Sequence, residues 1–171
     1  TPFIGGILAD RLLGQRIAIY IGGILMALSQ FMLATHAWMM AQDAAASQAA
    51  TSQAAMSPAM LDMLFFGGLA TLAAGNGFFK PNISTIVGSL YQQGDSRRDG
   101  AFTIFYMGIN IGAAAAAYTG QVAETKGWHL GFIMAGVGML LGLVIFTMFK
   151  RSLGTAGLPP RPAALREMAV P

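Results

Sequence analysis

Four long runs of apolar residues dominate the sequence, separated by short polar stretches. They cover residues 17–40, 59–90, 101–123 and 131–149. Each supplies roughly the 20 residues that an α-helix needs to cross a bilayer core about 30 Å thick. The runs lack the alternation of a membrane β-strand, and only helices and closed barrels satisfy their backbone hydrogen bonds in lipid. The pattern predicts an all-α fold of polytopic membrane helices.

The polar stretches suggest how these helices are connected. Residues 41–57 are rich in Ala, Ser and Gln and are expected to form a loop, after which Ser57 and Pro58 start the next helix. Residues 1–8 resemble the end of a further helix, so we expect a piece of a longer protein. Residues 1–154 then form one partial bundle, and the proline-rich residues 155–171 begin a flexible cytoplasmic linker.

Composition supports a membrane protein. Hydrophobic residues make up 55% of the chain and charged residues only 10%, against about 25% charged in ordinary soluble domains. The mean hydropathy is +0.59. The chain has no cysteine, which excludes disulfides and thiolate metal sites within it.

The net charge of +3 indicates topology rather than nucleic-acid binding. Eight of the ten basic residues lie in segments 9–16, 91–100 and 150–171, which an even number of spans separates. The opposite side has only Lys126. By the positive-inside rule the eight are cytoplasmic, and we expect a bacterial-type inner membrane.

Lys80 is the most informative residue because it is charged and lies inside an apolar run. About ten residues, or roughly 15 Å of helix, separate it from the loop that follows. A lysine at that depth costs several kcal/mol unless it faces water or a partner, and no acid in this chain lies at matching depth. The adjoining Pro81 and Asn82 favour a bent, cavity-lining helix over a lysine that merely reaches the membrane surface.

Tyr106 and Asn110 are four residues apart and share a helix face with Thr103. This polar face is expected to line a cavity, where it could hydrogen-bond a polar ligand. The structural alternative is a bridge from Asn110 to a neighbouring helix. A stripe of small residues that predicts close helix packing follows the opposite face: Gly108, Gly112, Ala116 and Gly120.

The segment 5–16 forms a glycine-rich, charged loop. Its glycines permit a tight turn, Asp10 can cap the next helix, and Arg11 and Arg16 can anchor anionic headgroups. Elsewhere His36 and His129 lack partners at metal-ligand spacing, so we expect no metal and no cofactor. No nucleophile elbow, phosphate loop or carboxylate pair indicates an enzyme.

Three of these segments together resemble the proton-dependent oligopeptide transporters of the major facilitator superfamily. The stretch Gly-Gly-Ile-Leu-Ala-Asp-Arg-Leu-Leu-Gly resembles the loop between the second and third helices of that family. Residues 75–82 with Ser84 resemble its fourth helix, Asp-Ser-Arg-Arg-Asp at 95–99 the following loop, and residues 105–112 its fifth-helix signature. The resemblance covers nearly all of residues 1–153.

The resemblance implies part of an N-terminal six-helix bundle in a symporter of di- and tripeptides, with the proton as coupling ion. Lys80, Tyr106 and Asn110 match substrate-site positions, and Lys80 matches a lysine that pairs with a seventh-helix acid. Gly6, Asp10, Arg11 and Gly14 match the cytoplasmic gate motif. The expected partners are small peptides, the lipid bilayer and the remaining helices of the transporter.

The family's acidic first-helix motif and its C-terminal bundle have no counterpart in these residues, so the chain alone is not expected to transport. Two other functions stay open. One is a carrier on the same scaffold for nitrate or another anion, since a buried cation suits either. The other is a non-transporting membrane subunit that assembles through the small-residue face of 108–120. Peptide preference, proton stoichiometry and oligomeric state are not encoded in any recognisable motif.

Overall fold

The computed structural model describes residues 6, 13–48, 57–92 and 94–159. Its long helices are α2 (Gln15–Gln48), α3 (Pro58–Ser89), α4 (Arg97–Lys126) and α5 (Trp128–Phe149), and a short 3-10 helix, η2 (Lys150–Leu153), follows. The four α-helices are long and apolar enough to cross a membrane. The described residues include no strand. The all-α prediction is confirmed.

The helices extend beyond the apolar runs that identified them. α2 continues to Gln48 rather than ending near residue 40, because Ala and Gln are strong helix formers even where the chain is no longer apolar. α4 begins at Arg97 and ends at Lys126 instead of covering 101–123. Several residues that the sequence placed in loops are therefore helical. Residues 49–56 lie outside the described part of the chain.

The connection between α4 and α5 is a single residue, Gly127, although the apolar runs left residues 124–130 between them. Its φ of 114° lies in a region that favours glycine, and its N–H donates to the Ala123 carbonyl at 3.0 Å. At the start of α3, Ser57 occupies the N-cap position and Pro58 is the first helical residue, as predicted.

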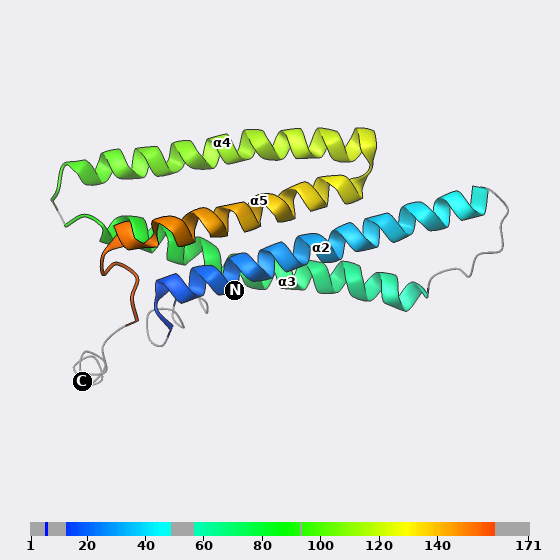
Figure 1. Cartoon of the computed structure of the whole chain (residues 1–171), viewed down its shortest axis with the longest axis horizontal. Coiled ribbons are helices and arrows are strands. Elements are labelled where there is room, and N and C mark those ends of the chain that lie inside the picture. The colour runs from blue at the N-terminus through cyan, green and yellow to red at the C-terminus, as the bar shows by residue number, and fades with distance from the viewer. Residues whose placement is uncertain (1–5, 7–12, 49–56, 93, 160–171) are drawn as a thin grey trace.

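α2 is the centre of the described bundle. It packs most extensively on α3 and next on α5, whereas α4 contacts α5 and only a little of α3 (Figure 1). The burial follows this order, because α2 contributes the most buried residues and α4 contributes only Ala123. α4 leaves large apolar side chains such as Ile104 and Ile111 exposed. A surface of this kind needs lipid or further helices to cover it.

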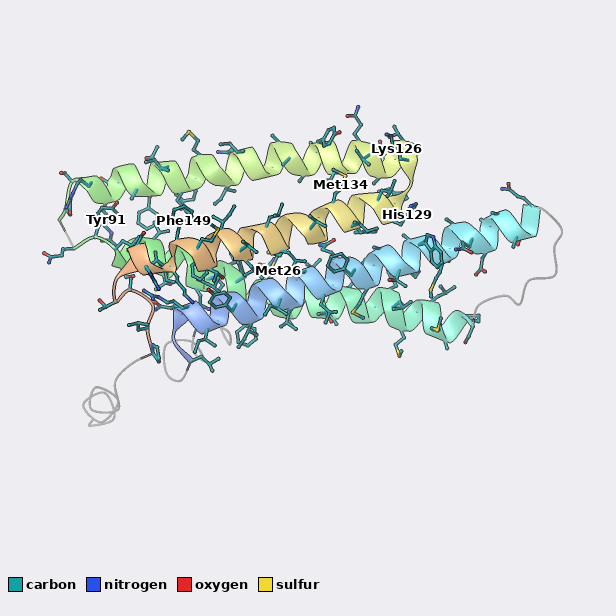
Figure 2. The ribbon with its side chains drawn as sticks, in the orientation of Figure 1. Met26, Tyr91, Lys126, His129, Met134 and Phe149 are labelled. Carbon is teal, nitrogen blue, oxygen red and sulfur yellow. The ribbon has the colours of Figure 1, made fainter. Side chains whose placement is uncertain are left out.

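The backbones of α2 and α3 approach each other closely at Gly22 and Gly75. A Cβ atom on Gly22 would lie 2.7 Å from the Gly75 carbonyl oxygen, and one on Gly75 would lie 2.8 Å from the Gly22 carbonyl oxygen. Met26, labelled on α2 in Figure 2, also meets Gly75, since its Cγ would be 2.8 Å from that Cβ. Only glycine at both positions allows the two backbones to touch.

The starts of α2 and α4 and the ends of α3 and α5 lie at one end of the bundle, on the left in Figure 1. We call this the basic end, because it carries most of the described basic residues: Arg16, Arg97, Arg98, Lys150 and Arg151. Lys126, labelled in Figure 2, lies at the opposite end, beside the α4–α5 turn. The helix order thus gathers positive charge at one end, as the sequence predicted.

Candidate functional site

Lys80 projects from α3 with an exposed side chain. Asn76 and Ser84 lie one turn to either side and share its helix face, and the Ser84 hydroxyl donates to the Lys80 carbonyl at 3.2 Å. The ammonium forms no ion pair or hydrogen bond with any residue that the structure describes. α3 therefore presents a polar stripe of three residues with an unpaired cation at its centre.

The opposite side of α3 anchors the helix in the bundle. Asn82, about 200° around the axis from Lys80, is only 1% exposed, and its Nδ2 donates to the Phe78 carbonyl at 2.6 Å. Ile86, one turn further, is also 1% exposed. Pro81 lies inside α3, and the helix continues through it to Ser89. Burial of Asn82 and Ile86 fixes the rotation of α3 so that Lys80 points outward.

Tyr106 and Asn110 occupy the exposed side of α4. Tyr106 is 60% exposed and contacts the rings of Phe102 and Phe105, and Asn110 is exposed as well. The hydroxyl of Thr103 on the same face donates to the Asp99 carbonyl of its own helix at 2.9 Å. The predicted polar face therefore exists and is free to meet a ligand or another part of a protein.

The structure does not bring Lys80 together with the two α4 residues. No hydrogen bond or ion pair joins Lys80 to Tyr106 or Asn110, and α3 contacts α4 sparingly, near Gly88 and Phe102. The described helices thus supply two separate polar faces. A single binding site that uses both requires other parts of the protein to enclose it.

The small-residue stripe of α4 faces inward, as its position opposite Tyr106 and Asn110 implies. Its members Gly108, Gly112 and Ala116 line a groove of about 1040 Å³ between α4 and α5, and Gly138 and Gly142 line the groove from the α5 side. The predicted close packing is wrong within the described chain, because a Cβ on Gly108, Gly112 or Gly120 would meet no atom within 4 Å. Close packing occurs at Gly22 and Gly75 instead.

The gate-motif residues of the sequence analysis fall partly outside the described residues. Asp10 and Arg11 do so, and their role stays a prediction. Gly6 is helical, and no described residue would lie within 4 Å of a Cβ there. Gly14 is buried with a φ of 78°, and a Cβ there would lie 2.6 Å from the Pro159 nitrogen. Glycine at position 14 is thus required by both backbone conformation and space.

A charged turn joins α3 to α4 at the basic end. The Asp95 carboxylate accepts hydrogen bonds from the Arg97 backbone N–H at 2.9 Å and from its guanidinium at 2.9 and 3.2 Å. Arg97 also lies 5.9 Å from the ring centroid of Tyr91. The guanidinium hydrogen bonds hold the pKa of Asp95 below its usual value of 3.8. This turn fixes the entry of α4.

The two histidines lie in aromatic surroundings. The ring of His36 lies 5.2 Å from that of Phe65, and His129 lines a small hollow with Trp38. Nowhere in the described ranges do three His, Cys, Asp or Glu side chains gather.

Two features were missed by the sequence reasoning. The stripe around Lys80 could have been found, because Asn76 and Ser84 stand at helical spacing from it. The role of Arg16 could not, since its partners lie about 140 residues away along the chain. Its guanidinium, expected to anchor headgroups, instead donates to the carbonyls of Gly154 and Ala156.

Known proteins resemble this chain over most of its length. The model of the POT family matches residues 16–163. A peptide transporter of Yersinia enterocolitica subsp. palearctica, YePEPT, is 42% identical over 146 residues, which make up 85% of this chain and 24% of that protein. A di-/tripeptide transporter of Lactococcus lactis subsp. lactis is 39% identical over 147 residues, covering 85% of this chain and 25% of that protein.

Solved structures agree with the sequence relatives. The crystal structure of a peptide transporter POT in complex with sulfate superposes with a TM-score of 0.72 at 38% identity, covering 98% of this chain and 31% of that one. The chain spans about a quarter of the length of the curated relatives it matches. Since the family model covers most of the sequence, and the relatives and solved structures are transporters, the chain belongs to the POT family of integral membrane proteins.

Proposed function

We propose that this chain forms part of the N-terminal bundle of a proton-coupled symporter for di- and tripeptides. The observation that carries the proposal is the exposed Lys80 ammonium on a membrane helix, without an anionic partner among the described residues. A charge on a membrane helix must face water or an anion rather than lipid. The relatives named for peptide transport support the substrate class.

The chemistry of a short peptide fits the two polar faces. A peptide carries a terminal carboxylate, for which Lys80 is a complementary cation, and backbone amides that can hydrogen-bond the phenol of Tyr106 and the amide of Asn110. The two faces stand on different helices. Helices outside this sequence would therefore complete the cavity, in keeping with the quarter of its relatives' length that the chain spans.

Proton coupling would arise because an acid of the protein and the peptide carboxylate compete for the Lys80 ammonium. Without substrate, Lys80 pairs with an acid supplied by the rest of the protein. A peptide carboxylate then displaces that acid, and a proton neutralises it. Breaking a charge pair that is shielded from water changes the free energy more than breaking an exposed pair, which contributes only about 0–1 kcal/mol. Breaking the pair would free the two bundles to rock about a midplane site.

The charge distribution supports an orientation. Arg16, Arg97, Arg98, Lys150 and Arg151 gather at the basic end, and positively charged loops are retained in the cytoplasm. We therefore assign the basic end to the cytoplasmic side of a bacterial-type inner membrane. The turn at Gly127 and the far ends of α2 and α3 would face outward.

Uptake of labelled dialanine tests the proposal. The complete transporter that contains this chain is reconstituted in liposomes with a pH gradient, acidic outside. Lys80→Ala should reduce gradient-driven uptake by about tenfold or more, the effect of removing one partner of a shielded charge pair. The control is Lys126→Ala, which removes the same side chain from the exposed last turn of α4 and should leave uptake near wild type.

Three outcomes would contradict the proposal. Equal uptake by the two variants would remove Lys80 from the mechanism. Uptake of nitrate in place of dialanine would favour an anion carrier on the same scaffold. Absence of any solute-coupled proton movement in the wild type would favour a membrane subunit without transport activity.

A further inference from the structure

The last six described residues, 154–159, fold back onto the start of α2. η2 ends at Leu153, and Gly154 and Gly157 then reverse the chain with φ values of 55° and 73°. Backbone hydrogen bonds stabilise the turns, including Ala156 N–H to the Leu153 carbonyl at 3.0 Å. This segment, which we call the strap, has a defined conformation at the point where the sequence predicted a flexible linker.

Arg16 holds the strap with three hydrogen bonds. Its Nε donates to the Ala156 carbonyl at 2.7 Å and its Nη2 to the Gly154 carbonyl at 2.7 Å. Its backbone N–H donates to the Gly157 carbonyl at 3.1 Å. The fixed fork of a guanidinium can hold two carbonyls at once, which the single ammonium of lysine does less well. Hydrogen bonds from a charged donor are among the stronger ones in proteins.

Two glycines let the strap lie against the helices. Gly14 contacts Pro159 so closely that a Cβ would be 2.6 Å from the proline nitrogen. A Cβ on Gly157 would be 2.7 Å from Ile86 Cδ1 and 3.2 Å from Arg16 Cγ. Ile86 is one of the most buried side chains in the described chain. The strap therefore covers the end of α3 as well as the start of α2.

The strap joins three helix ends at one place. It continues from α5 through η2, is bound by Arg16 and Gly14 at the start of α2, and covers Ile86 near the end of α3. The side chains of Lys150 and Arg151 are exposed and form no bond with described residues. Among the described basic residues at this end, Arg16 is therefore the one whose side chain hydrogen-bonds to the strap.

We propose that Arg16 latches the strap so that residues 154–159 move as part of the helical bundle, and that any hinge in the following chain begins after Pro159. Arg16 is a positioning residue in this view, because it acts through the strap carbonyls rather than on a transported solute. The proposal does not depend on which solute is carried.

Hydrogen exchange of the complete protein in nanodiscs tests the latch. The Gly154 and Ala156 amides donate to the η2 carbonyls of Arg151 and Leu153, and the Leu158 amide donates to the Thr155 carbonyl. Exchange of these amides therefore reports whether the strap is closed. Arg16→Gln should accelerate their exchange by about tenfold or more, the factor expected from loss of charge-assisted hydrogen bonds. Arg151→Gln is the matched control, because it removes one positive charge from the same end, and exchange should stay as in wild type.

A spin label on the strap provides a second test. Leu158 is 51% exposed, so Leu158→Cys with a nitroxide should be tolerated and should give an immobilised spectrum in the wild-type background. Arg16→Lys, which keeps the charge but loses the fork, should make that spectrum more mobile. A mobile label with Arg16 intact, or unchanged strap exchange in Arg16→Gln, would overturn the proposal even if transport were normal.

Discussion

The contact of α2 with α3 at Gly22 and Gly75 predicts a large difference between two similar alanine substitutions. Gly75→Ala places a methyl group 2.8 Å from the Gly22 carbonyl oxygen and 2.9 Å from the Met26 nitrogen, both backbone atoms. Gly67→Ala, two turns earlier on α3, meets only the terminal methyl of Met32, at 3.2 Å. A methionine side chain can move aside, whereas a helix backbone cannot.

The magnitude follows from the distances. Ordinary van der Waals contact begins near 3.4 Å, so α2 and α3 must separate by about 0.6 Å to accept the methyl at position 75. A gap of about 0.5–1 Å forfeits a quarter to a half of the attraction of each atom pair along the interface. Overpacking of this kind costs about 1–3 kcal/mol. Both variants gain helix propensity of about 1 kcal/mol, so their difference isolates the packing cost.

The assay is equilibrium unfolding of the protein in mixed micelles, followed by the fluorescence of Trp38 on α2 and Trp128 on α5. Gly67→Ala should be as stable as wild type or slightly more stable. Gly75→Ala should have a free energy of unfolding lower than that of Gly67→Ala by about 1–3 kcal/mol. If the two variants agree within about 0.5 kcal/mol, the two backbones are not in contact at Gly22 and Gly75.

Two further predictions concern polar contacts. Tyr20→Phe removes the 2.9 Å hydrogen bond between the Tyr20 hydroxyl and Thr147 Oγ1, which joins α2 to α5, and should lower the free energy of unfolding by about 0.5–1.5 kcal/mol. The control Tyr118→Phe alters an exposed ring of α4 and should change the free energy of unfolding little. Equal effects of the two substitutions would contradict a stabilising bond between Tyr20 and Thr147. Because the folded-state pKa of Asp95 is lowered, the turn at 91–97 is stabilised above pH 3.8 and loses that contribution as pH falls through the lowered pKa. An NMR titration of the carboxyl carbon should give a midpoint below 3.8 that rises in Arg97→Gln, and a wild-type midpoint at or above 3.8 would argue against the ion pair.

Local sequence patterns were enough to predict the membrane helices and to identify Lys80 as a charge inside one of them. The length of an apolar run is a local property, so four runs predicted four membrane helices without knowledge of their neighbours. Lys80 stood out for the same reason, because the cost of a charge in a membrane depends on its depth along one helix. Helix ends were predicted less well, since Ala and Gln continue α2 past the end of its apolar run.

Tertiary structure decided which of several similar residues make contacts. The small residues of α4 and those at Gly22 and Gly75 are equivalent as sequence patterns, yet only the second set brings two backbones together in the described chain. Which glycine meets a neighbour depends on how helices are placed, and no local pattern records this. The pairing of Arg16 with carbonyls near position 155 spans about 140 residues. An arginine in a loop has the same local sequence whether it meets lipid or protein, and only the return of the chain after α5 distinguishes the two.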